Sequence, residues 1–341
     1  MGLLRRIFVG LVWLVGLGLG GVIALVLLLP RLHHPPIATT TTTTTTVSSG
    51  PSPSDHVHAP GDTVAVSPPT VVVPGATGTV VLTPPSAGPI ITDCSAKGYD
   101  AATAANAASL RTLTWSPFHR PEIGWETYAP RIGQEIGAAC GPDTPGFAEA
   151  LSRWQKKHRM PATGMMDEAT FTVMNGGWEL QRPFVRLSAT GVCPQAPSGA
   201  NLTRVDGTEA YGGKAIKLRS EALDSYRRMV AAARAEVPAI AADHHLLTIA
   251  SGYRTPEDDN ARCAKDNDCG NITRAFCSAH RTGLAVDLVL GGGSPMSSDD
   301  PNRLRQSKTP AYAWLVANAG RFGWVNYPFE PWHWEWTGAA Q

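Results

Sequence analysis

Residue types capable of metal and acid–base chemistry gather in short motifs in the C-terminal half of the chain. The stretch "SAHRTGLAVD" contains His280 and Asp287, and "FEPWHWEW" contains Glu330 and His333. Two imidazoles and one carboxylate are the ligand set of a catalytic zinc ion, which keeps one coordination position open for water. Zinc lowers the pKa of that water to near neutrality. These residues therefore predict a metal-dependent hydrolytic site with His280, Asp287 and His333 as ligands.

Glu330 and Arg254 provide the other groups that such a reaction needs. Glu330 stands three residues before His333, where it can take the proton of the water and pass it to a leaving amine. Arg254 follows the apolar run "LLTIASGY", which is typical of a buried strand that ends at a glycine. Its planar cation can face an oxyanion or a substrate carboxylate. Each residue alone also has an ordinary structural explanation, but their joint presence favours catalysis.

The elements that must hold these residues can be read from the spacing of apolar positions. From Trp332 to Trp336 the residues alternate, so a strand would place the three Trp side chains on one face and His333 and Glu335 on the other. A Trp-rich core strand with an incidental His is the alternative interpretation. Residues 218–236 have the apolar spacing of a scaffold helix. Short strands that do not alternate regularly with helices predict an α+β domain, an antiparallel sheet with flanking helices.

Three motifs, SGYR, SxHxxGxAxD and EPWH, occur in this order within residues 186–341. Together they resemble the VanY-type D-alanyl-D-alanine carboxypeptidases of zinc peptidase family M15. The resemblance implies a role for each matched residue: zinc ligands His280, Asp287 and His333, a general base at Glu330, transition-state stabilisation by Arg254 and substrate binding by Ser278 and Arg254.

That family resemblance implies release of the C-terminal D-Ala from peptidoglycan stem pentapeptides. An L,D-carboxypeptidase or a peptidoglycan endopeptidase of the same family is the alternative, because both can use the same metal ligands. A non-catalytic wall-binding protein with a structural zinc is less favoured. A structural zinc needs no base such as Glu330, and its fourth position is usually closed.

Residues 94–182 are predicted to form a small all-α module. Apolar residues recur at helical spacing in "FAEALSRW", and Asp167 is placed to cap a second helix after a turn at Gly164; residues 128–139 can supply a third. The L-x-x-W-Q and "DEAT" patterns resemble the three-helix peptidoglycan-binding domain, the alternative being a generic helical bundle. The resemblance implies a module that binds the sacculus and raises local substrate concentration without touching the reacting bond.

The N-terminal part has the composition of an anchor and a linker. Residues 7–29 carry no charge and are long enough to span a bilayer as a helix, so residues 1–32 are predicted to be an uncleaved membrane anchor. Arg5 and Arg6 precede the span, which favours a cytoplasmic N-terminus and a catalytic domain facing the periplasm or cell wall. A twin-arginine export signal is the alternative. Residues 33–93 are rich in Thr and Pro and are predicted to be a disordered linker.

Charge and cysteine content narrow the location and the partners further. The chain has 29 Lys and Arg against 28 Asp and Glu, which does not favour a nucleic-acid partner. Its six cysteines indicate disulfides in an exported protein, with the pairing left open. Cys263, Cys269 and Cys277 lack the spacing of a zinc site and are predicted to staple a polar loop at the lip of the cleft.

Overall fold

The computed structural model describes residues 90–266 and 277–338. All of them belong to one compact unit, Thr70–Gln341. The predicted membrane span at 7–29 and nearly all of the predicted linker lie outside the described residues. Within the described ranges, no helix has both the length and the apolar character needed to cross a bilayer.

The first part of this unit consists mainly of short helices. Its elements are α2 (Asp100–Ser109), β1 (Thr114–Trp115), β2 (Glu122–Ile123), η1 (Glu126–Tyr128), α3 (Ala129–Ile136), α4 (Pro145–Lys157), α5 (Glu168–Gln181) and α6 (Pro183–Leu187). Helices are present at the three predicted places, and the Asp167 carboxylate caps α5 by accepting a hydrogen bond from the Thr170 N–H at 2.7 Å. The disulfide Cys94–Cys140 joins the start of this part to the loop before α4.

The prediction that this segment is all-α is wrong, because β1 and β2 pair as an antiparallel hairpin. Trp115 of β1 is buried in the same hydrophobic cluster as the helices, and its indole N–H donates to the Gly124 carbonyl at 2.9 Å. The hairpin therefore closes part of the core that helices alone would leave open. Strands of two residues are too short to give a readable alternation in the sequence.

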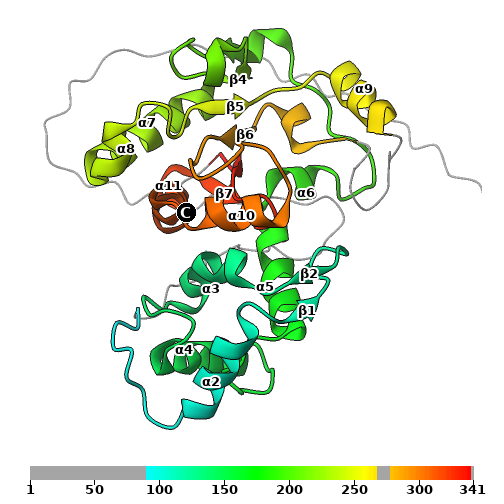
Figure 1. Ribbon diagram of the computed structural model, residues 1–341. Helices are drawn as coiled ribbons and strands as arrows, with labels where there is room; N and C mark the ends of the chain where they lie inside the picture. The colour runs from blue at the N-terminus through cyan, green and yellow to red at the C-terminus, as the bar shows by residue number, and fades with distance from the viewer. Residues whose placement is uncertain (1–89, 267–276, 339–341) are drawn as a thin grey trace, which may run out of the picture. The chain divides into compact units, whose positions relative to one another are not determined.

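The second part is built on an antiparallel sheet, as predicted (Figure 1). The sheet has four strands in the order β5-β6-β8-β7. The strands are β5 (Ile249–Ser251), β6 (Ala285–Leu288), β7 (Trp324–Asn326) and β8 (His333–Trp336), with a separate pair β3 (Leu202–Arg204) and β4 (Lys217–Arg219). The helical elements are η2 (Gly199–Asn201), η3 (Tyr211–Gly213), α7 (Ser220–Glu236), α8 (Pro238–Ala242), α9 (Pro256–Asp266), η4 (Ala279–Thr282), α10 (Asp300–Ser307), α11 (Pro310–Asn318) and η5 (Ala319–Phe322).

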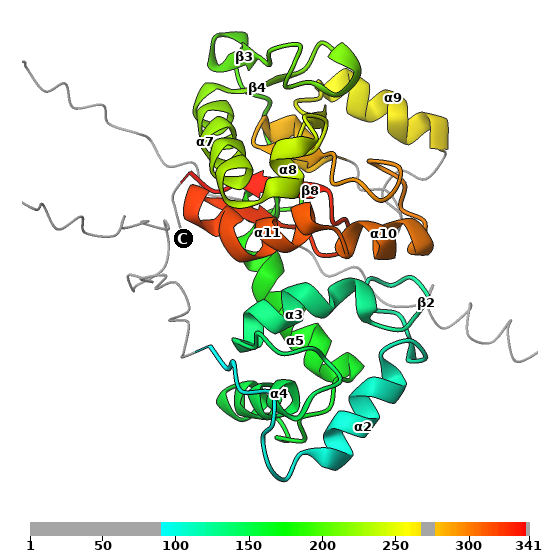
Figure 2. The same ribbon diagram turned by 60° about the vertical axis from the view of Figure 1, so that its left-hand side comes forward.

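The two faces of this sheet differ in character. Val286 and Trp334 point into a hydrophobic cluster formed with α7, α8 and α11, which gather beside the sheet in both views (Figures 1 and 2). Strand alternation then sends Asp287, His333 and Glu335 to the opposite face. The Trp residues of "WHWEW" belong to the core as predicted, with Trp336 only partly buried. The polar face is where the candidate site lies.

Candidate metal centre

Strand register brings the two parts of the site together. Asp287 on β6 pairs directly with His333 on β8, so two residues that are far apart in sequence become cross-strand neighbours. On the other side of β6, Ser251 of β5 is opposite Asp287, after an irregularity in the register between Ile249 and Ser251. Irregularities of this kind often re-aim side chains next to active sites. Asp287 therefore occupies the middle of the polar face.

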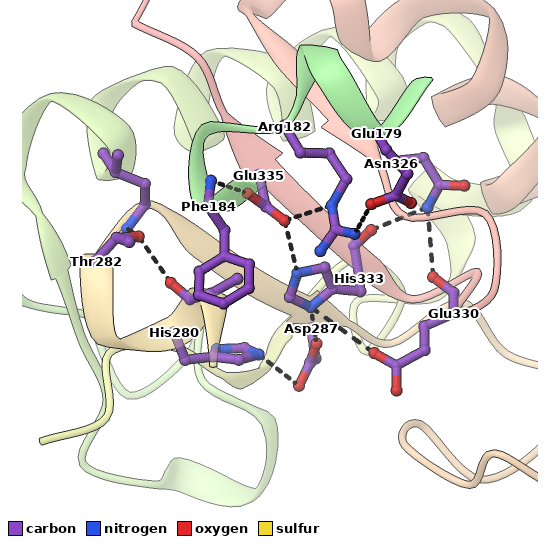
Figure 3. A network of polar contacts seen from close by, with 12 residues as sticks. Glu179, Arg182, Phe184, His280, Thr282, Asp287, Asn326, Glu330, His333 and Glu335 are labelled. Carbon is purple, nitrogen blue, oxygen red and sulfur yellow. Dashed lines mark hydrogen bonds and ion pairs between the residues drawn. The ribbon is translucent and has the colours of Figure 1, made fainter. Parts of the chain in front are cut away.

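His280, Asp287 and His333 form a compact cluster that can hold a metal ion (Figure 3). Each offers one ligand atom, and these atoms all lie within 4.8 Å of one another. The Asp287 carboxylate lies 3.2 Å from His280 Nε2 and 2.9 Å from His333 Nδ1. All three side chains are buried. Two nitrogens and one carboxylate oxygen match the donor set of a catalytic zinc site.

His280 is oriented by the backbone around it. Its Nδ1 donates a hydrogen bond to the Gly252 carbonyl at 2.8 Å, so Nε2 faces Asp287. A side chain at Gly252 would not fit, because a Cβ there would lie 2.8 Å from the Lys217 carbonyl oxygen. Gly283 ends η4 with a φ of +69°, a conformation that glycine adopts at little cost. The glycines of the two motifs thus place the imidazole.

The electrostatics of the cluster suit a cation. Burial alone would raise the pKa of Asp287, but the neighbouring imidazoles hold it well below its ordinary value. Burial would lower the pKa of His333, but its hydrogen bond to Asp287 and the nearby Glu335 carboxylate raise the pKa to about 9. Burial lowers the pKa of His280. A proton therefore resides on His333 at neutral pH in the metal-free protein, and a bound metal would displace it.

Glu330 lies at the edge of the cluster, in the turn between β7 and β8. Its Oε2 is 4.0 Å from His333 Nδ1, and its side chain is 31% exposed. Desolvation raises the pKa of this carboxyl, which brings it closer to the working range of a general base. Asn326, which the sequence analysis missed, fixes the turn because its side-chain amide donates to the His333 carbonyl at 2.9 Å.

Arg254 also reaches the cluster, whereas Ser278 is engaged elsewhere. The Arg254 guanidinium lies 3.5 Å from Asp287 and donates to Ser251 Oγ at 2.8 Å. The Ser278 hydroxyl donates at 2.8 Å to Asp259 of α9. This hydrogen bond connects Ser278 to helix α9. The role of Ser278 in substrate binding stays a prediction.

Residues that the sequence analysis did not connect with the site lie at the Nε2 side of the His333 ring. Glu335 Oε1 lies 3.4 Å from His333 Nε2 and accepts from Arg182 Nε at 2.7 Å (Figure 3). Glu335 Oε2 accepts from the Phe184 N–H at 2.9 Å. Burial would raise the pKa of Glu335, but Arg182 and His333 lower it to about 2. The sequence analysis placed Glu335 on the same strand face as His333. It could not identify Arg182 as the partner of Glu335, because the two residues are 153 positions apart.

One of the predicted cysteines of the cleft loop is bound outside that loop. Cys277 forms a disulfide with Cys193, which follows α6. Cys269 lies outside the described residues. The end of the loop before His280 is therefore fastened to the segment after the helical part, a pairing that cysteine spacing could not reveal.

Comparison with known proteins assigns the family of the second part. Residues 215–339 match the family model VanY, D-alanyl-D-alanine carboxypeptidase. This part of the chain is a VanY-type domain, as the motifs predicted, and the domain contains Arg254, Glu330 and the three clustered ligands. Arg182 and Phe184 lie outside the matched residues.

Two solved structures are similar at low identity. A structure of the LdcB LD-carboxypeptidase, described as revealing the molecular basis of peptidoglycan recognition, is 24% identical with a TM-score of 0.31 and covers 42% of this chain and 70% of that one. A structure of the vancomycin resistance D,D-pentapeptidase VanY in complex with Zn(II) is 20% identical with a TM-score of 0.27 and covers 42% and 84%. No curated protein gives a significant match.

Proposed function

We propose that this protein is a zinc-dependent D-alanyl-D-alanine carboxypeptidase that removes the terminal D-Ala from peptidoglycan stem pentapeptides. The observation that carries the proposal is the cluster of His280, Asp287 and His333 within 4.8 Å, inside a VanY-type domain. Glu330 beside this cluster supports a catalytic rather than a structural metal, because a structural zinc usually has four protein ligands and needs no base.

The metal would contribute Lewis acidity, which lowers the pKa of a water molecule at its open coordination position. Glu330 takes a proton from the attacking water as the hydroxyl oxygen bonds to the carbonyl carbon. When the C–N bond breaks, Glu330 passes this proton to the leaving amine of D-Ala. The partly exposed position of Glu330 supports this role, since a shuttling base must reach both water and substrate.

Arg254 supports the assignment as an exopeptidase. Removal of a terminal residue requires recognition of a free carboxylate, and a guanidinium binds carboxylates through paired hydrogen bonds. Arg254 lies next to Asp287 with its side chain 16% exposed, so it can pair with the substrate carboxylate or with the oxyanion beside it. Ser278 is proposed to contribute to the same substrate pocket.

The rest of the chain would place this activity at the cell wall. Residues 94–182 are proposed as a peptidoglycan-binding module that contacts the sacculus, and residues 1–32 as a single-pass anchor in the inner, cytoplasmic membrane. The Thr/Pro-rich segment 33–93 would act as the linker between them. The domain 186–341 would then face the periplasm or the cell wall, where the stem peptides are.

The decisive experiment compares three substrates for the zinc-loaded protein, with products weighed by mass spectrometry. A pentapeptide ending in D-Ala-D-Ala should lose one D-Ala, while its C-terminally amidated form should resist cleavage and a tetrapeptide should be a poor substrate. Efficient cleavage of the amidated peptide would indicate an endopeptidase. A preference for the tetrapeptide would indicate an L,D-carboxypeptidase. The Glu330→Gln variant serves as the inactive control.

A further inference from the structure

A buried ion pair connects the end of helix α5 with strand β8. The Arg182 side chain is 8% exposed and that of Glu335 is 1% exposed. Arg182 Nε donates to Glu335 Oε1 at 2.7 Å (Figure 3). Because both charges are removed from water, loss of either one would leave its partner buried and uncompensated. The pair therefore fixes both side chains firmly in place.

The Glu335 carboxylate also contacts His333, one of the proposed metal ligands. Glu335 Oε1 lies 3.4 Å from His333 Nε2, while His333 Nδ1 lies 2.9 Å from Asp287 on the other side of the ring. Histidines that bind metals almost always present their second nitrogen to a carboxylate, a carbonyl or water, which fixes the ring and increases its basicity. Glu335 has this position toward His333.

Its contacts also exclude Glu335 as the general base. One oxygen is held by Arg182 and the other by the Phe184 N–H at 2.9 Å. The side chain is buried at the Nε2 side of His333, away from Asp287. A base must reach the attacking water near the ligand atoms, and Glu330 is the carboxylate placed there.

Arg182 itself is held rigidly. A second nitrogen of its guanidinium lies 2.6 Å from Glu179, and the cation sits 4.0 Å from the centre of the Tyr327 ring. Helix α6, which begins directly after Arg182, packs against both β8 and η4. The α5–α6 junction thus supplies a cation and a backbone donor to one carboxylate.

We propose that Arg182 is a positioning residue of the metal site, which acts through Glu335 to hold His333 as a ligand. The helical part of the chain is then a component of the catalytic unit rather than a wall tether alone. Arg182 lies outside the residues that match the VanY family. The inference rests on the proposed function only in that His333 binds the metal.

The test is a zinc titration of the purified full chain against a chelator of known affinity. Arg182→Met and Glu335→Gln should each weaken zinc binding by about 10- to 100-fold, the usual effect of removing such support from a metal ligand. If Arg182 acts through Glu335, the double variant should bind zinc within about threefold of Glu335→Gln alone, because coupled residues are not additive.

Arg303→Met is the matched control. Arg303 is 1% exposed and pairs at 2.9 Å with Glu122 of the helical part, so it joins the same two parts of the chain. Its other hydrogen bonds are to Tyr128, Asp300 and the Phe329 carbonyl, and its guanidinium lies 4.4 Å from the centre of the Phe329 ring. The control should lower stability yet bind zinc as the wild type does. Equal zinc loss in Arg303→Met and Arg182→Met would mean general loosening and would overturn the inference.

Unchanged zinc affinity in folded Arg182→Met would also overturn it. If Arg182→Met does not fold, Glu335→Gln decides, since glutamine keeps the size and an oxygen for the Phe184 N–H. Wild-type zinc affinity in that variant contradicts the inference. A wild type that binds zinc but cleaves no stem peptide would refute the proposed function and leave the zinc comparison intact.

Discussion

The two ring nitrogens of His333 face surroundings of different origin. Nδ1 meets Asp287 and Glu330, which belong to the matched family domain. Nε2 meets Glu335, whose own partners, Arg182 and the Phe184 N–H, come from the helical part of the chain. The comparison teaches that the motifs bring together the atoms that could bind a metal, whereas residues distant in the sequence hold the carboxylate that faces one of these ligands.

The largest effect is expected from the loss of one of the proposed metal ligands. His280→Ala removes one of three donors and leaves Asp287 and His333 to bind the metal alone. The variant should lose stoichiometric zinc and with it all hydrolysis of the pentapeptide. Metal analysis of the purified protein, with about one zinc per chain in the wild type, measures this. An active His280→Ala protein would show that the cluster is not the catalytic site.

Glu330→Gln should separate chemistry from metal binding. Turnover should fall by roughly 10²- to 10⁴-fold, the usual contribution of a general base, because glutamine cannot accept the proton of the water. Zinc affinity should stay as in the wild type. In Glu335→Gln, by contrast, activity should return when enough zinc is added. Near-normal turnover of Glu330→Gln at saturating zinc would reassign the base.

Arg303→Met should affect stability without affecting the metal. It leaves Glu122 buried without its cation, which should lower the free energy of unfolding by about 3–5 kcal/mol. Urea denaturation of the zinc-free protein gives this value directly. A change below about 1 kcal/mol would indicate that the Arg303–Glu122 pair contributes no more than a surface ion pair does.

The smallest effect is expected from an exposed ion pair whose side chains do not belong to the metal cluster. Arg227 and Glu209 are joined at 2.8 Å, but the Arg227 side chain is 44% exposed. Arg227→Gln should therefore change unfolding free energy by no more than about 1 kcal/mol and leave zinc affinity unaltered. A zinc effect here would indicate that any lost ion pair disturbs the metal site, and the contrast with Arg182 would disappear.

Much of the arrangement around the proposed metal ligands could be predicted from the sequence, because short local patterns of residues determine it. The alternation around His333 predicted a strand with Trp residues toward the core. Residue types and the motif resemblance singled out His280 and Asp287, which the structure places beside His333. The antiparallel sheet followed from short strands that do not alternate regularly with helices. Cross-strand pairing of Asp287 with His333 then places these motifs together.

The residues that hold these ligands in place could not be predicted from the sequence, and the reason is physical. A carboxylate at 335 on the buried face needs a partner, but its partner is separated by 153 residues, and no periodicity links them. The Cys193–Cys277 disulfide is likewise a tertiary contact. The β1–β2 hairpin was missed because its strands are only two residues long. Ser278 was assigned a role by resemblance, and its contact with Asp259 was invisible in the sequence.

The most direct test of the central claim is a metal-depletion experiment with the pentapeptide substrate. The protein is stripped with a chelator, zinc is returned in steps, and release of D-Ala is followed by mass spectrometry. The stripped protein should be inactive, and about one zinc per chain should restore release of a single D-Ala, as expected for a mononuclear site. Full activity of the metal-free protein would contradict the claim.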